Sequence, residues 1–293
     1  MSNPVSYLSA QQQKRQPPEQ KAVPGVKHMI AIASGKGGVG KSTTTTNLAL
    51  ALASTGARVG ILDADLYGPS QPHMLGLKGM PDSPDGKILE PMIGHGIQTM
   101  SIGFLVDEEA PIIWRGPMIT QALTRLMYET RWDNLDYLLV DMPPGTGDIH
   151  LTMAQRMPVS GAVIVTTPQD IALLDARKGL RMFEKVNVPV LGIIENMSIH
   201  ICSNCGHQEH IFGQGGARRM ASEAGTTLLG ELPLDLGIRT GSDAGEPIMA
   251  AEPDGQIADA YRAIASQLTQ MLPESGTAEK GVHKPPLPTI VMD

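Results

Sequence analysis

The chain is poor in several features, and each shortage excludes a class of protein. It has only two cysteines among 293 residues, too few for a disulfide-stapled secreted scaffold. No apolar run approaches the roughly 20 residues that a membrane-spanning helix needs. The N-terminus lacks the apolar core of a secretory signal peptide. We therefore expect a protein of the reducing cytoplasm.

Positive charge is also scarce. Lys and Arg together number 23 against 30 Asp and Glu, which gives a net charge of −7. This balance argues against a main role in binding nucleic acid or an anionic membrane. Apolar residues make up 41% of the sequence, enough to build a sizeable core.

The most informative stretch is residues 34–42, SGKGGVGKS, which fits the phosphate-binding pattern G-x-x-x-x-G-K-[ST]. An apolar run before it, residues 29–33, predicts a buried strand, and a helical pattern follows over residues 42–53. Glycines let a loop wrap a phosphate, and a helix N-terminus attracts anions. We therefore predict nucleotide binding, with Lys41 on the β- and γ-phosphates and Ser42 on Mg²⁺. A glycine-rich turn with no ligand is the alternative. The expected nucleotide contacts in this loop are Gly35, Lys36, Gly37, Gly38, Val39, Gly40, Lys41, Ser42 and Thr43.

Short apolar runs alternate with longer helical stretches as far as residue 272. Such continuous runs are typical of parallel strands buried on both faces, and helices between them form βαβ units. The predicted fold is therefore a doubly wound α/β domain, with a mostly parallel sheet and helices on both faces. The further predicted strands are residues 58–62, 137–140, 162–165, 188–194 and 228–232.

Three stretches depart from this alternation. Residues 77–114 are rich in Gly, Pro and Met and predict an inserted hairpin region. Residues 1–27 are polar and predict a flexible leader, and residues 273–293 predict a flexible tail. The expected ATPase domain is thus residues 28–272, ending in a helix over residues 256–271.

Acidic residues follow two of the predicted strands. Asp63 and Asp65 come after the second strand, and Asp141 closes the strand at residues 137–140. Carboxyl ends of parallel strands line the ligand crevice of such sheets. A nucleotide hydrolase needs acids there to hold Mg²⁺ and to position the attacking water. An ordinary acidic loop is the alternative.

Polar residues after two later strands are candidates for the base pocket. The Asn196 amide can donate to and accept from a base edge, so it is a candidate adenine reader. Tying down a loop is its alternative role. Pro233 and Asp235, after the next strand, are candidates for the other wall of the pocket.

Both cysteines lie in one C-x-x-C motif, Cys202 and Cys205. Such a pair serves as a redox dithiol, half a zinc site or half an iron–sulfur site. A one-chain zinc site would use His207 and His210 as well, with cramped spacing. Since one chain supplies two thiolates and a cluster or a Cys₄ zinc takes four, a symmetric homodimer fits better.

Eight segments stand in order along residues 34–217: SGKGGVGKST, DADLYGPS, WRGPM, DMPPGTGD, TTPQDIAL, ENMS, CSNCGH and IFGQGGA. Together they resemble one known family, the Mrp/ApbC branch of iron–sulfur cluster carrier ATPases. The phosphate loop of this family has the deviant Walker A form of the MinD/ParA-like class. Many bacterial members carry an extra N-terminal domain, whereas here only about 27 polar residues precede the loop.

The resemblance implies roles for particular residues. Lys36 resembles the signature lysine that reaches the partner's nucleotide across a homodimer, and Asp65 resembles the acid that positions water. Asp63 and Asp141 resemble groups around Mg²⁺. Cys202 and Cys205 resemble the pair that bridges a [4Fe–4S] cluster between two subunits.

The family's activity is slow ATP hydrolysis coupled to loading or delivering a cluster. Its partners are cluster scaffold proteins and apo iron–sulfur acceptor proteins. Two rival readings remain. One is a spatial-positioning ATPase of the MinD/ParA type, which needs a membrane helix or a basic DNA patch and leaves the C-x-x-C motif unexplained. The other is an ATPase dimer fastened by a structural Cys₄ zinc.

Overall fold

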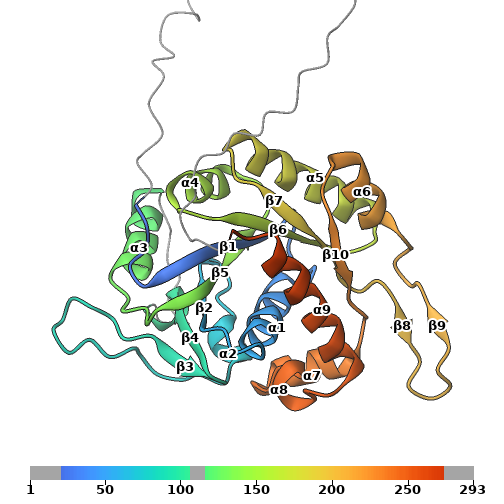
Figure 1. Cartoon of the computed structure of the whole chain (residues 1–293), viewed down its shortest axis with the longest axis horizontal. Helices are drawn as coiled ribbons and strands as arrows, with labels where there is room; N and C mark the ends of the chain where they lie inside the picture. The colour runs from blue at the N-terminus through green and yellow to red at the C-terminus, as the bar shows by residue number, and fades with distance from the viewer. Residues whose placement is uncertain (1–20, 106–115, 274–293) are drawn as a thin grey trace, which may run out of the picture.

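The computed structural model describes residues 21–105 and 116–273 (Figure 1). The expected leader therefore lies outside the described residues up to residue 20. The expected tail lies outside them from residue 274, and so do residues 106–115 of the expected hairpin region. Nowhere within the described ranges does a helix combine the length and apolar character needed to cross a membrane.

An eight-stranded sheet organises the chain, in the order β10-β7-β6-β1-β5-β2-β4-β3. Its pairings are parallel except that of β3 with β4. The strands are β1 (Val26–Ser34), β2 (Val59–Asp63), β3 (Met92–Gly94), β4 (Ile97–Ser101), β5 (Leu135–Pro144), β6 (Gly161–Thr166), β7 (Val190–Glu195) and β10 (Leu228–Glu231). The predicted mostly parallel sheet is confirmed.

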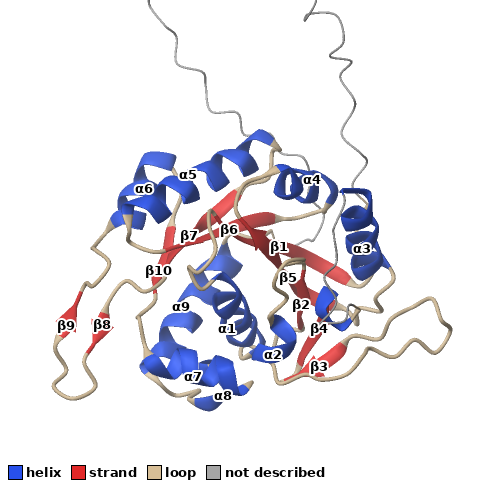
Figure 2. Ribbon diagram, turned by 180° about the vertical axis from the view of Figure 1, so that it is seen from behind, coloured by secondary structure: helices blue, strands red, loops and turns tan. Residues whose placement is uncertain are grey.

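Helices cover both faces of this sheet, as Figure 2 shows from behind. One face carries α3 (Gly116–Tyr128), α4 (Asp148–Arg156), α5 (Asp170–Lys185) and α6 (Gly216–Ala224). The other carries α1 (Lys41–Ala53), α2 (Gln71–Met74), α7 (Leu236–Ala244), α8 (Ile248–Ala251) and α9 (Gln256–Gln270). The doubly wound architecture is thus confirmed.

Side chains of the central strand β1 alternate between the two cores. Met29, Ala31 and Ala33 belong to the core under α3–α6, whereas Ile30 and Ile32 belong to the core under α1 and α9. Both sets are almost fully buried. Since successive strand residues point to opposite faces, a continuous apolar run is what a strand covered on both sides requires.

The region predicted as an inserted hairpin, residues 77–114, instead contributes strands to the main sheet. β3 and β4 do form a hairpin, but β4 also pairs in parallel with β2 and so extends the main sheet. A short 3-10 helix, η2 (Ile102–Phe104), follows. β4 joins the sheet because Ile97, Thr99 and Met100 are fully buried there. The hairpin is therefore part of the fold rather than an insertion beside it.

A second hairpin was not predicted. β8 (His200–Ile201) and β9 (Gln208–Glu209) form a two-stranded ribbon around the C-x-x-C motif. Figures 1 and 2 both show it projecting from the body beyond the edge strand β10.

Strand order also places the ligand crevice. β1 lies between β5 and β6. The chain leaves β1 for β2 on one side of it and later crosses from β5 to β6 on its other side, so the direction of winding reverses beside β1. In open α/β sheets, ligands bind at the carboxyl ends of the strands at such a switch point. The loop that follows β1 is the phosphate-binding sequence.

Candidate functional site

The loop between β1 and α1 has the backbone of a phosphate cradle. Gly38 and Gly40 have φ of 79° and 81°, in the left-handed region that favours glycine. A Cβ at Gly38 would meet nothing within 4 Å, so the loop is open on that side. No side chain caps α1 and no acidic residue lies in its first turn. The helix therefore offers its positive end to an anion.

Neighbouring segments hold this loop in place. The Gly145 N–H donates to the Ser34 carbonyl at 3.1 Å, which joins the loop after β5 to the end of β1. The Ser34 hydroxyl donates to the Lys36 carbonyl at 2.9 Å. A Cβ at Gly35 would lie 2.1 Å from the Asp175 backbone, so α5 packs directly on the loop. The cradle is thus preformed by a bond within the loop and by contacts from two other parts of the chain, the loop after β5 and α5.

Two carboxylates face each other at the ends of β2 and β5. Asp63 pairs with Asp141 in the parallel register, and both side chains are fully buried. Asp63 accepts hydrogen bonds from the Ser101 hydroxyl and from three backbone N–H groups, those of Asp65, Ser70 and Gln71. Burial, followed by the charge of Asp141, raises the pKa of Asp63 to about 7.

Lys41 brings a positive charge to these acids. Its Nζ forms an ion pair with Asp141 and lies 3.7 Å from Asp65 Oδ2 and 3.2 Å from the Ser42 hydroxyl. Asp141 also accepts from the Thr45 hydroxyl at 3.3 Å. Burial raises the pKa of Asp65, although the Lys41 charge opposes that shift. The structure therefore brings Lys41, Ser42, Asp63, Asp65 and Asp141 together.

This donor set fits Mg²⁺ and a nucleotide phosphate. Hydroxyl and carboxylate oxygens are the hard ligands that Mg²⁺ prefers, and Ser42, Asp63 and Asp141 supply them. Bound there, Mg²⁺ would neutralise phosphate charge. Lys36 lies half-buried in the loop, and no ion pair among residues 21–105 and 116–273 involves its ammonium group.

Asn196 reaches the same loop from the end of β7. Its Nδ2 donates to the Val39 carbonyl at 2.9 Å, so one amide hydrogen ties down the loop. The adenine-reading role stays a prediction, with the remaining amide atoms available for it. Asp235 caps α7 by accepting from the Gly237 N–H at 2.7 Å. Pro233 and Asp235 follow β10, the neighbour of β7 in the sheet.

The cysteines lie apart from this cluster, in the turn between β8 and β9. The Cys202 N–H donates to the His207 carbonyl at 2.9 Å, and Gly206 closes the turn at φ 71°. Cys202 is half-buried and Cys205 is exposed. Backbone hydrogen bonds from Asn204 and Cys205 lower the pKa of Cys202, which favours its thiolate.

Within residues 21–105 and 116–273, one chain does not assemble a complete metal site around these thiols. Across the described residues, no group of three or more His, Cys, Asp and Glu side chains is placed to hold a metal ion. The His210 Nδ1 instead lies 2.7 Å from the Ser198 carbonyl. Nor does the motif open a helix, as a thioredoxin-type dithiol would.

Sequence reasoning missed two buried polar residues, one that contacts the acids and one that contacts the loop after Asp141. Gln71 is fully buried and contacts both Asp63 and Asp141. His150 on α4 is buried, its Nε2 lies 2.6 Å from the Pro143 carbonyl, and burial lowers its pKa. Neither residue belongs to a recognisable spacing pattern, so no sequence signal distinguishes them from surface polar residues.

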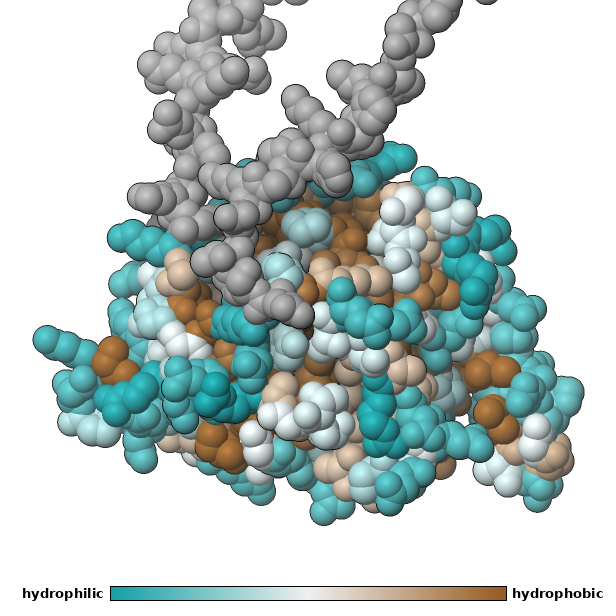
Figure 3. Space-filling model, viewed as in Figure 1, coloured by the Kyte–Doolittle hydropathy of each residue, from teal (hydrophilic) through white to brown (hydrophobic). Residues whose placement is uncertain are grey.

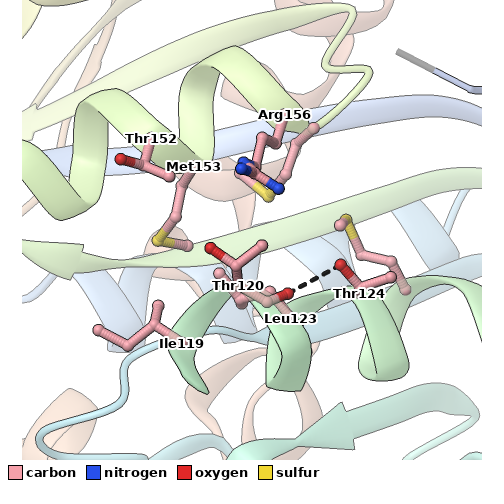
Figure 4. Close-up of a pocket in the computed structure, with 9 residues that line it drawn as sticks. Ile119, Thr120, Leu123, Thr124, Thr152, Met153 and Arg156 are labelled. Atoms are coloured by element: carbon pink, nitrogen blue, oxygen red, sulfur yellow. Dashed lines mark hydrogen bonds between the residues drawn. The ribbon is translucent and has the colours of Figure 1, made fainter. Parts of the chain in front are cut away.

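A hollow between α3 and α4 is a separate feature (Figure 4). Its lining combines apolar side chains with four polar ones, those of Thr120, Thr124, Thr152 and Arg156. The Thr124 hydroxyl donates to the Thr120 carbonyl at 2.8 Å within the same helix. The lining of this hollow includes no residue of the phosphate loop and none of Asp63, Asp65 and Asp141, so the hollow is not the predicted nucleotide site.

Comparison with known proteins identifies the class of this site. The family model described as ParA, NUBPL iron-transfer P-loop NTPase, matches residues 25–269. An Escherichia coli iron-sulfur cluster carrier protein is 57% identical over 254 residues, which is 86% of this chain and 69% of that protein. The mouse iron-sulfur cluster transfer protein NUBPL is 52% identical over 260 residues, 88% of this chain and 82% of that protein.

Solved structures agree with the fold. A nucleotide-binding protein of Archaeoglobus fulgidus in complex with ADP superposes with a TM-score of 0.70 at 40% identity, covering 81% of this chain and 93% of that one. The cell division ATPase MinD of Pyrococcus furiosus gives a TM-score of 0.61 at 22% identity, covering 84% and 99%. At that identity, the likeness to MinD concerns the fold alone.

The raised pKa of Asp63 predicts that protons compete with the divalent cation. A carboxyl group with a pKa near 7 holds its proton at pH 6 and has lost it at pH 8, whereas the cation needs the ionised form. We expect the Mn²⁺ affinity of the ADP-loaded protein to rise about tenfold from pH 6 to pH 8 and then to level off. Electron paramagnetic resonance of free Mn²⁺ measures it. Asp63→Asn should show a flatter profile; identical profiles in the two proteins would refute the assignment.

The contact between Gly40 and Asn196 predicts that Gly40→Ala impairs nucleotide binding. The new Cβ would lie 2.2 Å from Asn196 Nδ2 and would push the amide off the loop. Gly56→Ala is the matched control, because Gly56 has φ 90° with nothing within 4 Å of a Cβ. Both variants take on the left-handed strain of about 1–2 kcal/mol. Only Gly40→Ala should weaken ADP binding in calorimetry, and equal affinities would contradict the clash.

Proposed function

This chain belongs to the NUBPL iron-transfer branch of the ParA-type P-loop NTPases, and we propose that two copies of it hold one [4Fe–4S] cluster and deliver it to apo-proteins under the control of ATP. The chain is an ATPase and an iron–sulfur cluster carrier. The observation that supports the finer proposal most directly is that the phosphate loop and the C-x-x-C hairpin meet at one short segment, residues 195–198.

In the nucleotide half, the loop N–H groups and Lys41 bind the phosphates, while Ser42, Asp63 and Asp141 hold Mg²⁺. Asp65, close to Lys41, orients the attacking water. Lys36 reaches the nucleotide of the second subunit. Lys36 is suited to this because it lies half-buried on the loop while Lys41 is buried among the acids.

In the cluster half, Cys202 and Cys205 of each subunit supply two of the four thiolates that a [4Fe–4S] cluster needs. The hairpin presents apolar surface beside them, as Figure 3 shows, with Ile201 and Ile211 exposed to 41% and 49%. Ile171 and Leu174, one helical turn apart on α5, are exposed to 69% and 59%. These side chains follow the carboxyl ends of β6 and β7, so they are suited to lie in a contact between two copies on the nucleotide side.

Segment 195–198 connects the two halves. Asn196 bonds the phosphate loop, and the Glu195 carboxylate accepts from the Ala217 N–H at 2.7 Å, at the start of α6. The Ser198 carbonyl lies 2.7 Å from His210 Nδ1, on the second leg of the hairpin. A shift of the loop on binding ATP would therefore pull on both legs of the hairpin.

The hairpin's first leg is also tied to the base-pocket loop. The Leu234 N–H donates to the Ile199 carbonyl at 2.8 Å, and His200 Nδ1 lies 3.1 Å from the Leu234 carbonyl. Leu234 stands between Pro233 and Asp235, the candidate wall of the base pocket. Nucleotide occupancy and hairpin geometry are therefore coupled in our proposal through two sets of hydrogen bonds.

The proposed partners are apo iron–sulfur proteins as acceptors and scaffold proteins as donors, and the proposed location is the cytoplasm. A positioning role of the MinD type has less support, because the likeness to MinD lies below 25% identity whereas the carrier relatives exceed 50%. A structural Cys₄ zinc uses the same four thiolates, so metal analysis has to separate it from a cluster.

Reconstitution tests the cargo. Anaerobic protein supplied with iron and sulfide should turn brown and bind about four iron and four sulfide per dimer. The double variant Cys202→Ala/Cys205→Ala should bind none, because each subunit then offers no thiolate. Metal and sulfide assays, the visible spectrum and sedimentation of the same sample measure this. Tightly held zinc with no reconstitutable cluster would refute the carrier proposal in favour of the zinc clasp.

Cluster transfer to an apo-ferredoxin tests the coupling. Lys41→Ala should abolish the stimulation of cluster transfer by ATP, because the variant lacks the buried ammonium group that would bind the phosphates. His210→Leu should lower the stimulation severalfold while ATP hydrolysis continues, because it removes the bond to Ser198. The transfer rate is followed by circular dichroism of the acceptor's cluster.

His207→Leu is the matched control, since His207 is exposed on the same hairpin. It should transfer clusters like the wild type. A wild-type rate in Lys41→Ala would show that nucleotide does not drive transfer. Loss of metal in both histidine variants would instead point to a metal site completed within one chain.

A further inference from the structure

Gln71 is a fully buried polar side chain placed among the groups of the nucleotide site. It is the first residue of α2, directly after the acidic loop that begins at Asp63. Its backbone N–H donates to Asp63 Oδ2 at 3.1 Å. Its side-chain amide donates to Asp141 Oδ2 at 2.9 Å and to the Ser42 carbonyl at 3.1 Å. One residue therefore bonds both carboxylates that we assign to Mg²⁺, and also the backbone of Ser42.

The acceptor side of the same amide is also engaged. Gln71 Oε1 accepts from the Thr46 hydroxyl at 2.6 Å, on the α1 turn that follows Ser42. Because Asp141 Oδ2 and the Ser42 carbonyl accept hydrogen bonds, the NH₂ group faces them and Oε1 faces the Thr46 hydroxyl. The orientation of the donor is thus set by the fold before any ligand arrives.

Each oxygen of Asp141 has its own partners. Oδ1 faces Lys41 and Thr45, while Oδ2 receives the Gln71 amide. A buried carboxylate held at both oxygens cannot rotate without leaving a donor or an acceptor unpaired. Gln71 therefore fixes the plane of the Asp141 carboxylate relative to α1.

We propose that Gln71 is a positioning residue for the Mg²⁺–nucleotide complex. Its side-chain amide keeps Asp141 and the first turn of α1 in one arrangement beside Asp63, so that the oxygens around Ser42 converge on a single cation. The inference rests on the proposed nucleotide site. On this proposal, Gln71 strengthens the binding of the cation and has little effect on the binding of the nucleotide itself.

The test compares nucleotide binding with and without the cation. Gln71→Met preserves the length of the side chain and removes the donor. We expect the Mn²⁺ affinity of the ADP complex, measured by electron paramagnetic resonance, to fall about tenfold or more, as is usual for residues that orient metal ligands. The affinity for a fluorescent ADP in excess EDTA should stay within about twofold of the wild type, because the loop itself is intact.

Gln98→Met is the matched control. Gln98 on β4 also bonds a backbone group, because its side chain accepts from the Asp133 N–H at 2.9 Å. It does not contact Asp63, Asp65 or Asp141. It should leave both affinities unchanged. Gln71→Glu is the second variant, in case Gln71→Met fails to fold. It keeps the shape but places a carboxylate against Asp141, so it should weaken Mn²⁺ binding at least as much.

The outcomes separate the possible failures. If the wild type binds no ADP in EDTA or with Mn²⁺, the proposed nucleotide site itself is wrong. If the wild type binds both ligands and a folded Gln71 variant has a lower melting temperature but unchanged Mn²⁺ affinity, Gln71 only packs α2 against α1. That result would overturn the positioning role while leaving the ATPase site in place.

Discussion

The burial of two carboxylates side by side is the constraint on which the rest of the site depends. Parallel pairing of β2 with β5 sets Asp63 beside Asp141, and neither side chain reaches solvent. Buried charges are costly unless paired and hydrogen-bonded. Lys41 therefore lies against one acid, while backbone N–H groups and the Ser101 hydroxyl surround the other. The placement of α1, α2 and β4 follows from supplying these donors.

This constraint explains why the site suits a cation and a polyphosphate. The three acids with the single charge of Lys41 leave an excess of negative charge in a buried place, and burial, followed by the charge of Asp141, raises the pKa of Asp63. A divalent cation relieves that excess, and phosphates in turn need Lys41 and the loop N–H groups. Cation and nucleotide should therefore stabilise each other's binding, since each compensates the charge that the other introduces.

Features formed by residues close together in the sequence could be predicted from it, whereas contacts between residues far apart along the chain could not. The phosphate loop, its strand and α1 are contiguous, so motif and periodicity predicted them. Asp63 and Asp141 were predicted to lie at the site because each one ends an apolar strand, which is a local signal. Gln71 was missed because the residue that its side chain bonds, Asp141, lies 70 positions away in the sequence. β4 was missed as a sheet strand because its partner β2 lies across a stretch without clear periodicity. Asn196 was placed at the site, but its bond to Val39 needs coordinates to be seen.

The hairpin that carries the cysteines follows a different principle from the buried acids. A ribbon with two residues in each strand is barely stable by its own hydrogen bonds, so it depends on the ties of His200 and His210 to the body. A rigid site enclosing four ligands in one chain would hold a cluster firmly and resist giving it up. Two thiolates on a projecting ribbon form only half a site, which a second copy can complete and later release. On our proposal, the weakness of the hairpin is therefore what makes its cargo transferable, and its ties to segment 195–198 are what place that transfer under the control of the phosphate loop.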